Sequence, residues 1–114
     1  MVTPSVGSVV LVPFPFSDLS QTKLRPALVL ADSGRDDWIL CQITSNPYAD
    51  PLAVTLTDAD FSMGSLRVIS YARPGKLFTA NGSLMVSHVG NLSPGTVHNI
   101  VRAVVDLLLS GLKV

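Results

Sequence analysis

Short β-rich segments separated by turn-forming residues fill most of this sequence, and they restrict its fold more than any other feature. Six such segments are rich in aliphatic and aromatic residues and lie between glycine, proline, asparagine or aspartate residues: Val9–Val12, Pro26–Ala31, Trp38–Thr44, Ala53–Leu56, Leu66–Ala72 and Leu84–Val89. The first three are the most apolar and are predicted to be buried strands. Several short strands at this spacing predict a small, mainly β barrel.

The hydrophobic period changes near the C-terminus, where apolar residues recur at helical spacing. Seven of them fall at i, i+3, i+4, i+7, i+8, i+11 and i+12: Val97, Ile100, Val101, Val104, Val105, Leu108 and Leu109. Ser93 suits an N-cap, Pro94 the first helical position and Gly111 the C-terminal stop. We therefore predict one amphipathic helix at roughly 94–110. Its polar face carries His98, Arg102 and Asp106.

Length and composition indicate one domain, residues 1–114, with 47% hydrophobic and 14% charged residues. A chain with this many hydrophobic residues can fill a core and still have apolar surface left for a partner. The longest apolar run, Val9–Phe16, is far shorter than the roughly 18 residues that cross a membrane. Met1–Gly7 does not resemble a secretory signal, and the single cysteine, Cys41, excludes an internal disulfide. We expect a cytoplasmic protein with Cys41 in its core.

The formal net charge is zero, so composition alone does not favour nucleic-acid binding. The charges are unevenly placed along the chain. Residues 1–60 carry three basic residues and seven aspartates, a balance of −4, whereas residues 61–114 carry five basic residues and Asp106, a balance of +4. Such a split is compatible with one face that meets phosphates, and equally with a randomly decorated surface.

Motifs for nucleotide, zinc and metalloprotease chemistry are absent, because the sequence contains no GxGxxG, GxxxxGK[ST], CxxC or HExxH. The two histidines, His88 and His98, are interpreted as satisfied or solvated side chains. The acid pairs Asp36–Asp37 and Asp58/Asp60 lie in turn-like stretches, where capping of turns explains them. The segment between the first two strands, Pro13–Arg25, is expected to be a loop, and loops often carry binding groups.

Arg25 is the strongest candidate for a functional side chain. It directly precedes Pro26, which restricts Arg25 to an extended backbone at the rim of the sheet, and a guanidinium fixed there can bind a phosphate through two parallel hydrogen bonds. Thr44 and Ser45 end the next strand. If the two strands are neighbours, a cation and two hydroxyls meet at one place. Alternatively, Thr44 and Ser45 cap the turn before Asn46–Pro47.

The order and spacing of six motifs across nearly the whole chain resemble the MazF/PemK family of mRNA interferases. These are GSVVLV at 7–12, FPFSD at 14–18, KLRPALVL at 23–30, CQITS at 41–45, KLFT at 76–79 and VGNLS at 89–93. The RPALVL strand is the most specific of them. The resemblance implies an SH3-like β-barrel with a C-terminal helix, assembled as a homodimer that binds single-stranded RNA, with a cognate antitoxin whose short tail folds on binding.

By motif, Arg25 corresponds to the family's catalytic arginine and Thr44 to its active-site threonine. The resemblance also implies an RNA-binding role for six further residues: Phe16, Ser17, Lys23, Ser45, Arg67 and Tyr71. The two aromatic ones, Phe16 and Tyr71, can equally serve the core or a dimer interface. The implied reaction uses the 2′-OH of the RNA to attack its own phosphate, with no metal ion or other cofactor.

The sequence departs from the family pattern at two places. The family's opening Gly-Asp is Gly7-Ser8 here, and its Arg-x-Asp is Arg67-Val68-Ile69, so a carboxylate is missing and no general base is apparent. The main alternative is therefore a non-catalytic SH3-like module that binds nucleic acid or protein. A third possibility is a structural dimeric subunit that binds no RNA.

Overall fold

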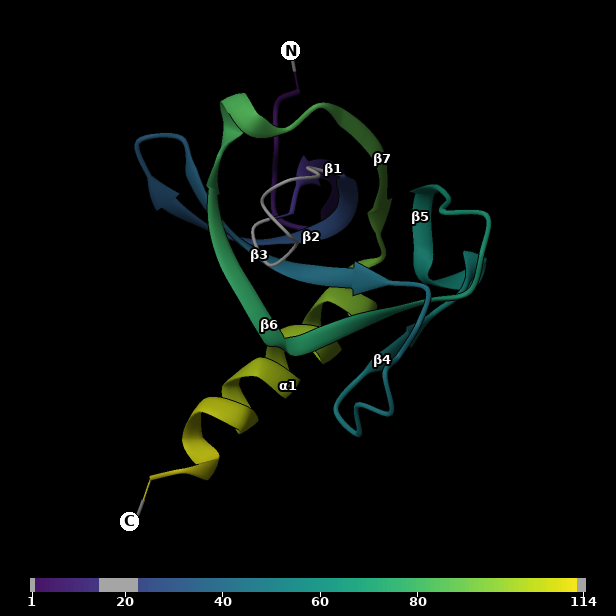
Figure 1. The fold of residues 1–114 in the computed structure, drawn as a ribbon, viewed down its shortest axis with the longest axis vertical. Helices are drawn as coiled ribbons and strands as arrows, with labels where there is room; N and C mark the ends of the chain where they lie inside the picture. Colours follow the sequence, from purple (N-terminus) through teal and green to yellow (C-terminus); the bar gives the residue numbers. More distant parts are fainter. Residues whose placement is uncertain (1, 15–22, 113–114) are drawn as a thin grey trace.

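The computed structural model describes residues 2–14 and 23–112. Seven strands form one curled antiparallel sheet in the order β4-β6-β3-β2-β1-β7-β5, and a single helix, α1, closes the chain (Figure 1). The strands are β1 (Ser8–Pro13), β2 (Leu24–Gly34), β3 (Asp37–Thr44), β4 (Val54–Leu56), β5 (Phe61–Gly64), β6 (Ser70–Asn81) and β7 (Ser87–Leu92). Two short 3₁₀ turns, η1 (Asp58–Asp60) and η2 (Gly82–Leu84), connect them. The predicted mainly β fold with a C-terminal helix is confirmed.

The central strands are buried on both faces of the curled sheet, which explains why their sequences are apolar without alternation. Neighbouring residues on one strand enter different core clusters: Val9 and Leu28 pack with Ile100 of α1, whereas Val10 and Ala27 pack with Leu40 on the other face. Cys41 is fully buried in the first cluster, as predicted. Burial raises the pKa of its thiol to about 12, so the thiol stays protonated and inert.

The helix α1 spans Pro94–Ser110, with Ser93 as N-cap and Gly111 as C-cap, in agreement with the prediction. Ile100 and Val104 are buried against the sheet. The far end of the apolar stripe is exposed because the helix extends beyond the strands (Figure 1). The predicted polar face is also confirmed, since His98, Arg102 and Asp106 are exposed. Among residues 2–14 and 23–112, no helix is long and apolar enough to cross a membrane.

Three strands in the second half of the chain differ from the prediction. The strand expected at Leu66–Ala72 begins only at Ser70, because Arg67 adopts a left-handed backbone (φ 65°), and it continues to Asn81. The segment expected at Leu84–Val89 starts with the η2 turn, so its strand is displaced to Ser87–Leu92. Strand β5 was not predicted, because most of its residues are exposed and form no hydrophobic pattern.

Strand β5 depends on two glycines that let it approach β7. Gly64 has φ 74°, and a Cβ there would lie 2.2 Å from the Val89 carbonyl oxygen. A Cβ on Gly90 would lie 2.4 Å from the Met63 carbonyl oxygen. Both obstacles are backbone atoms, so neither can move aside without separating the strands.

We therefore expect Gly64→Ala to lower the free energy of unfolding by about 1–3 kcal/mol, because it combines a left-handed backbone with a backbone clash. Chemical denaturation followed by circular dichroism measures the change. Gly95→Ala is the matched control, since a Cβ on Gly95 meets no atom within 4 Å and alanine favours a helix. Equal stability of Gly64→Ala and Gly95→Ala would contradict this account of β5.

Candidate functional site

One pocket of about 340 Å³ brings Arg25 and Thr44 together. It lies where the end of β1, the start of β2, the end of β3 and the middle of β6 meet, and it is lined by Phe14, Arg25, Gln42, Ile43, Thr44, Tyr48, Arg73 and Lys76. We call it the Arg25 pocket. Strands β2 and β3 are neighbours in the sheet, which is the arrangement that Arg25 and Thr44 need in order to lie close together. Ser45 is exposed beside the pocket and does not line it.

Arg25 lies opposite Val12 in the β1–β2 ladder, at the outer end of the buried strand Ala27–Val29. The following Pro26 keeps its backbone extended, so the side chain leaves the sheet at its rim. It is exposed, and it forms no hydrogen bond or ion pair with any residue that the structure describes. Its guanidinium is thus available for a ligand, and its planar shape suits two hydrogen bonds to one phosphate.

Thr44 serves the following turn as well as the pocket. Its Oγ1 accepts a hydrogen bond of 3.1 Å from the backbone N–H of Asn46, which is the capping role that the sequence allowed. A hydroxyl can accept and donate at the same time, so the Thr44 proton remains available for a ligand in the pocket. The capping role and the binding role are therefore compatible.

Arg73 is held in place by three neighbours. Its Nε donates to Asp50 Oδ2 at 3.0 Å and its Nη1 donates to Gln42 Oε1 at 3.3 Å. Its guanidinium also lies 5.2 Å from the centre of the Tyr48 ring. The Arg73 and Asp50 side chains are only 16% and 13% exposed. This ion pair ties the loop between β3 and β4 to strand β6.

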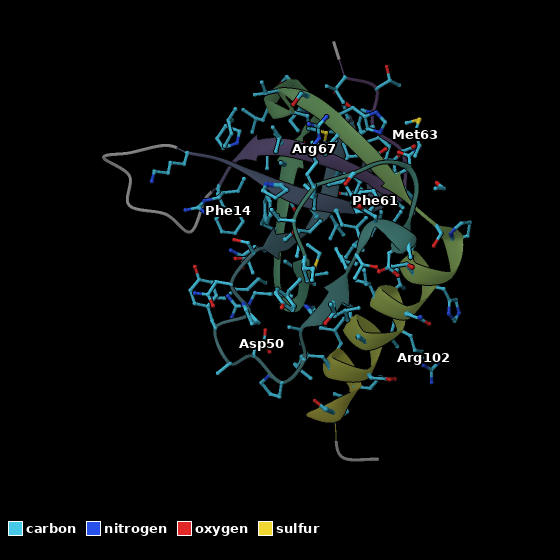
Figure 2. All side chains as sticks on the ribbon, turned by 90° about the vertical axis from the view of Figure 1, so that its right-hand side faces the viewer. Phe14, Asp50, Phe61, Met63, Arg67 and Arg102 are labelled. Carbon is cyan, nitrogen blue, oxygen red and sulfur yellow. The ribbon has the colours of Figure 1, made fainter. Side chains whose placement is uncertain are left out.

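The electrostatic balance of the pocket is positive. Arg25, Arg73 and Lys76 line it, and the nearby carboxylate of Asp50 is paired with Arg73. Phe14 and Tyr48 are the aromatic residues of its lining, and the Phe14 ring meets that of Phe78 edge to face at 5.3 Å. In Figure 2, Phe14 and Asp50 lie on the side of the molecule opposite to Arg102 of α1. A pocket with this charge and these aromatic residues suits a phosphate chain that carries bases.

Hydrogen bonds lower the pKa of the Asp50 carboxyl below its usual value. The backbone N–H of Leu52 is the largest cause and Arg73 follows. Because the carboxyl has a lower pKa in the folded protein than in the unfolded chain, its ionised form stabilises the fold at pH values above the unfolded-state pKa. This stabilisation is lost as the pH falls through the folded-state pKa.

Asp50→Asn should therefore melt at a lower temperature than the wild type at pH 7, and this difference should shrink as the pH is lowered below about 4. Thermal unfolding at pH 7 and at pH 3 measures it. Asp106→Asn, in the exposed pair with Arg102, is the control and should change little at either pH. A difference for Asp50→Asn that stays constant with pH would contradict the proposed ionic role.

The other predicted RNA-binding residues that the structure describes do not line the Arg25 pocket. Lys23 is exposed next to it, and its carbonyl accepts a hydrogen bond of 3.4 Å from the Phe14 N–H. Tyr71 is half-buried and lies opposite Thr44 in the β3–β6 ladder, so both side chains point to the same face. Phe16 and Ser17 lie outside the described residues, as does most of the predicted loop Pro13–Arg25.

Arg67 lines a different pocket of about 370 Å³, with Thr57, Asp58, Ala59, Val68 and Ile69. Ile69, where the family pattern has a carboxylate, is therefore also outside the Arg25 pocket. Ser8, the other departure, is buried and bonds to Ser5 at the start of β1. Both departures thus lie away from Arg25 and Thr44.

Both histidines are exposed and outside the pocket, as expected; His88 Nε2 bonds to Asn91 Oδ1 at 2.7 Å. In the described part of the chain, no three His, Cys, Asp or Glu side chains gather as a metal site would require. The acid pairs also serve turns: Asp36 accepts a bond from Trp38 Nε1, and Asp60 accepts one from the Thr57 N–H.

The sequence interpretation missed Gln42, Tyr48, Arg73 and Lys76. A signal for Arg73 was present, because Arg73-Pro74 repeats the Arg25-Pro26 pair and the same backbone argument applies to it. Gln42 and Tyr48 carry no comparable signal. The pairing of β3 with β6 brings Gln42 to Arg73, and the loop after β3 brings Tyr48 to it.

The structure is thus a curled antiparallel half-barrel that ends in a helix and carries a cation-lined pocket at its rim. The family model of PemK-like, MazF-like toxins of type II toxin–antitoxin systems matches residues 5–108. The protein therefore belongs to this toxin family, as the motifs had indicated.

Solved structures share this fold. MazF of Deinococcus radiodurans has a TM-score of 0.74 at 21% identity, over 95% of this chain and 98% of that one. An endoribonuclease from a mycobacterial species, solved in complex with its cognate antitoxin, has a TM-score of 0.66 at 18% identity, over 96% of both chains. The toxin MazF-mt6 of Mycobacterium tuberculosis has a TM-score of 0.68 at 16% identity, over 89% of this chain and 95% of that one. No curated protein matches the sequence.

Proposed function

We propose that this toxin is a cytoplasmic endoribonuclease that cleaves single-stranded mRNA without a metal ion. The observation that carries the proposal is the Arg25 pocket, where a guanidinium with no partner among the described residues faces the same space as the Thr44 hydroxyl and two further cations. The endoribonucleases among the structures with this fold support the activity.

In the proposed reaction, the 2′-oxygen of one nucleotide attacks the adjacent phosphorus and the bond from phosphorus to the 5′-oxygen breaks. The 2′-OH loses its proton and the leaving 5′-oxygen gains one, so the products are a 2′,3′-cyclic phosphate and a 5′-OH end. Arg25 neutralises the charge that builds on the phosphoryl oxygens, and Thr44 donates a hydrogen bond to the same group.

Among the residues that the structure describes, those that line the pocket include no histidine or carboxylate. Our proposal therefore assigns electrostatic stabilisation to Arg25 and Thr44 and leaves the two proton transfers to water. This composition also favours the second candidate function, a module of the same fold that binds RNA or protein without cleaving it.

A single assay separates these functions. Purified toxin is incubated with a labelled single-stranded RNA in EDTA, and cleavage and binding are measured in parallel. Cleavage to fragments with cyclic phosphate ends supports the endoribonuclease. Binding without cleavage selects the non-catalytic module, and neither activity selects the structural subunit. Cleavage that requires an added divalent metal ion would refute the proposed chemistry.

The proposed antitoxin partner is a short protein whose flexible tail orders on the toxin and blocks RNA binding. Complexes of MazE with MazF from Deinococcus radiodurans have the same toxin fold and support this assignment. Supplying the candidate antitoxin together with the toxin should relieve growth arrest.

The proposed assembly is a symmetric homodimer. Exposed apolar side chains at the end of the chain supply surface that a two-fold interface can bury on both copies: Val105, Leu108, Leu109 and Leu112. We expect light scattering at micromolar concentration to give twice the chain mass of 12.1 kDa. Leu108→Asp is an informative variant because its side chain is exposed and lies outside both core clusters. A wild-type protein of monomer mass would contradict the dimer.

A further inference from the structure

Tyr48 is an exposed aromatic residue with an unusual backbone at the Arg25 pocket. Its side chain lines the pocket, and the residue is 58% exposed. Both Tyr48 (φ 52°) and the following Ala49 (φ 54°) adopt the left-handed conformation, which residues other than glycine rarely adopt. Such conformations persist only where the surrounding structure imposes them, and they are concentrated at functional sites.

The loop around Tyr48 is held by a connected set of hydrogen bonds. Asn46 Oδ1 accepts from the Tyr48 N–H at 2.9 Å, and the Pro47 carbonyl accepts from the Asp50 N–H at 2.9 Å. Asp50 then accepts from the Leu52 N–H at 2.9 Å and from Arg73 at 3.0 Å. The loop is thus fixed to strand β6, so the ring is presented in one position.

Arg73 supports one face of the Tyr48 ring. Its guanidinium lies 5.2 Å from the ring centre, within the range of a cation–π contact. Hydrogen bonds from its Nε to Asp50 and from its Nη1 to Gln42 hold the guanidinium in this position. Because Tyr48 is largely exposed as a residue, we take the ring face opposite Arg73 as the surface that can receive a planar group.

We propose that Tyr48 is a stacking platform for one unpaired base of the RNA and that Arg73 is the positioning residue behind it. The inference rests on the proposed function, because the phosphate beside that base is the group that Arg25 binds. Stacking on an aromatic ring tolerates every base, since each has a π-face. Tyr48 therefore contributes affinity for single-stranded RNA and little sequence preference.

The test combines a protein variant with a missing base. The probe is a fluorescent single-stranded RNA made uncleavable by 2′-O-methyl groups, prepared as a series with one abasic site at each position. In the wild type, we expect one position where loss of the base weakens binding about 5- to 150-fold, the range for one stacked base. In Tyr48→Ala that loss should vanish at this position only, whereas Tyr48→Phe should keep it.

Two further variants separate stacking from effects on the loop. Leu52→Ala changes another exposed side chain of the same loop outside the pocket, and it should leave the abasic profile unchanged. Arg73→Gln should reduce the loss at the position read by Tyr48. Arg73→Lys should restore part of it, because a cation returns behind the ring. A merely structural role of Arg73 would change all positions equally.

The outcomes distinguish this inference from the function on which it rests. If the wild type binds and cleaves RNA but Tyr48→Ala keeps the same abasic profile, the platform is wrong and the proposed function stands. If Tyr48→Ala changes only the mass in light scattering, the ring belongs to a protein interface and the platform is again wrong. If the wild type neither binds nor cleaves RNA, the proposed function is wrong, and the stacking platform, which rests on it, is wrong as well.

Discussion

Arg25→Ala is expected to slow RNA cleavage by about a hundredfold, because removing one donor to the developing charge typically costs roughly 3 kcal/mol of transition-state stabilisation. RNA binding should fall much less, since it draws on Lys76, Arg73 and the aromatic surface as well. Single-turnover cleavage and fluorescence anisotropy with an uncleavable RNA measure the two effects separately.

Four variants give this prediction its controls. Arg25→Lys should not restore the full rate, because an ammonium lacks the planar pair of donors. Arg102→Ala removes an exposed arginine from the far side of the molecule and should cleave at the wild-type rate (Figure 2). Thr44→Val should slow cleavage less than Arg25→Ala, whereas Thr44→Ser keeps the hydroxyl and the bond to Asn46. Wild-type cleavage by Arg25→Ala would show that the reaction occurs elsewhere.

Replacing the 2′-OH before the scissile bond with hydrogen is expected to abolish cleavage. The reaction has no other nucleophile in our scheme, so the loss should be complete and not a fraction of the rate. The same substitution one nucleotide away should leave cleavage intact, which controls for changes in RNA shape. Gel electrophoresis with the two substrates measures this.

Mass spectrometry of the products completes that experiment. The fragments should end in a 2′,3′-cyclic phosphate and a 5′-OH, and EDTA should leave their yield unchanged. Cleavage of the deoxy substrate would instead indicate attack by water. It would also remove the reason for the selection of RNA over DNA.

The pocket shows how a protein without net charge can still gather positive charge at one place. The chain as a whole is neutral. Its fold nevertheless combines Arg25 from the acidic half of the sequence with Arg73 and Lys76 from the basic half. Local convergence of cations, and not net charge, supports the phosphate binding that we propose for the pocket.

Local patterns in the amino-acid sequence were enough to predict several parts of the structure. The helix at Pro94–Ser110 follows from its hydrophobic period and its end signals, and the buried strands follow from their apolar runs. The position of Arg25 at the sheet rim follows from Pro26, which acts on the adjacent residue. Each of these features arises within a few residues along the chain.

The set of side chains that share the pocket depends on contacts between distant parts of the chain, which local patterns do not specify. Gln42 meets Arg73 because β3 pairs with β6, across 31 residues of chain and past a register shift between Cys41 and Ile43. Tyr48 meets Arg73 from the loop that follows β3. A register shift of one residue reverses the faces of a strand, and no local pattern specifies it. Arg67, whose RNA-binding role stays a prediction, has a left-handed backbone before β6 and lines a different pocket from Arg25.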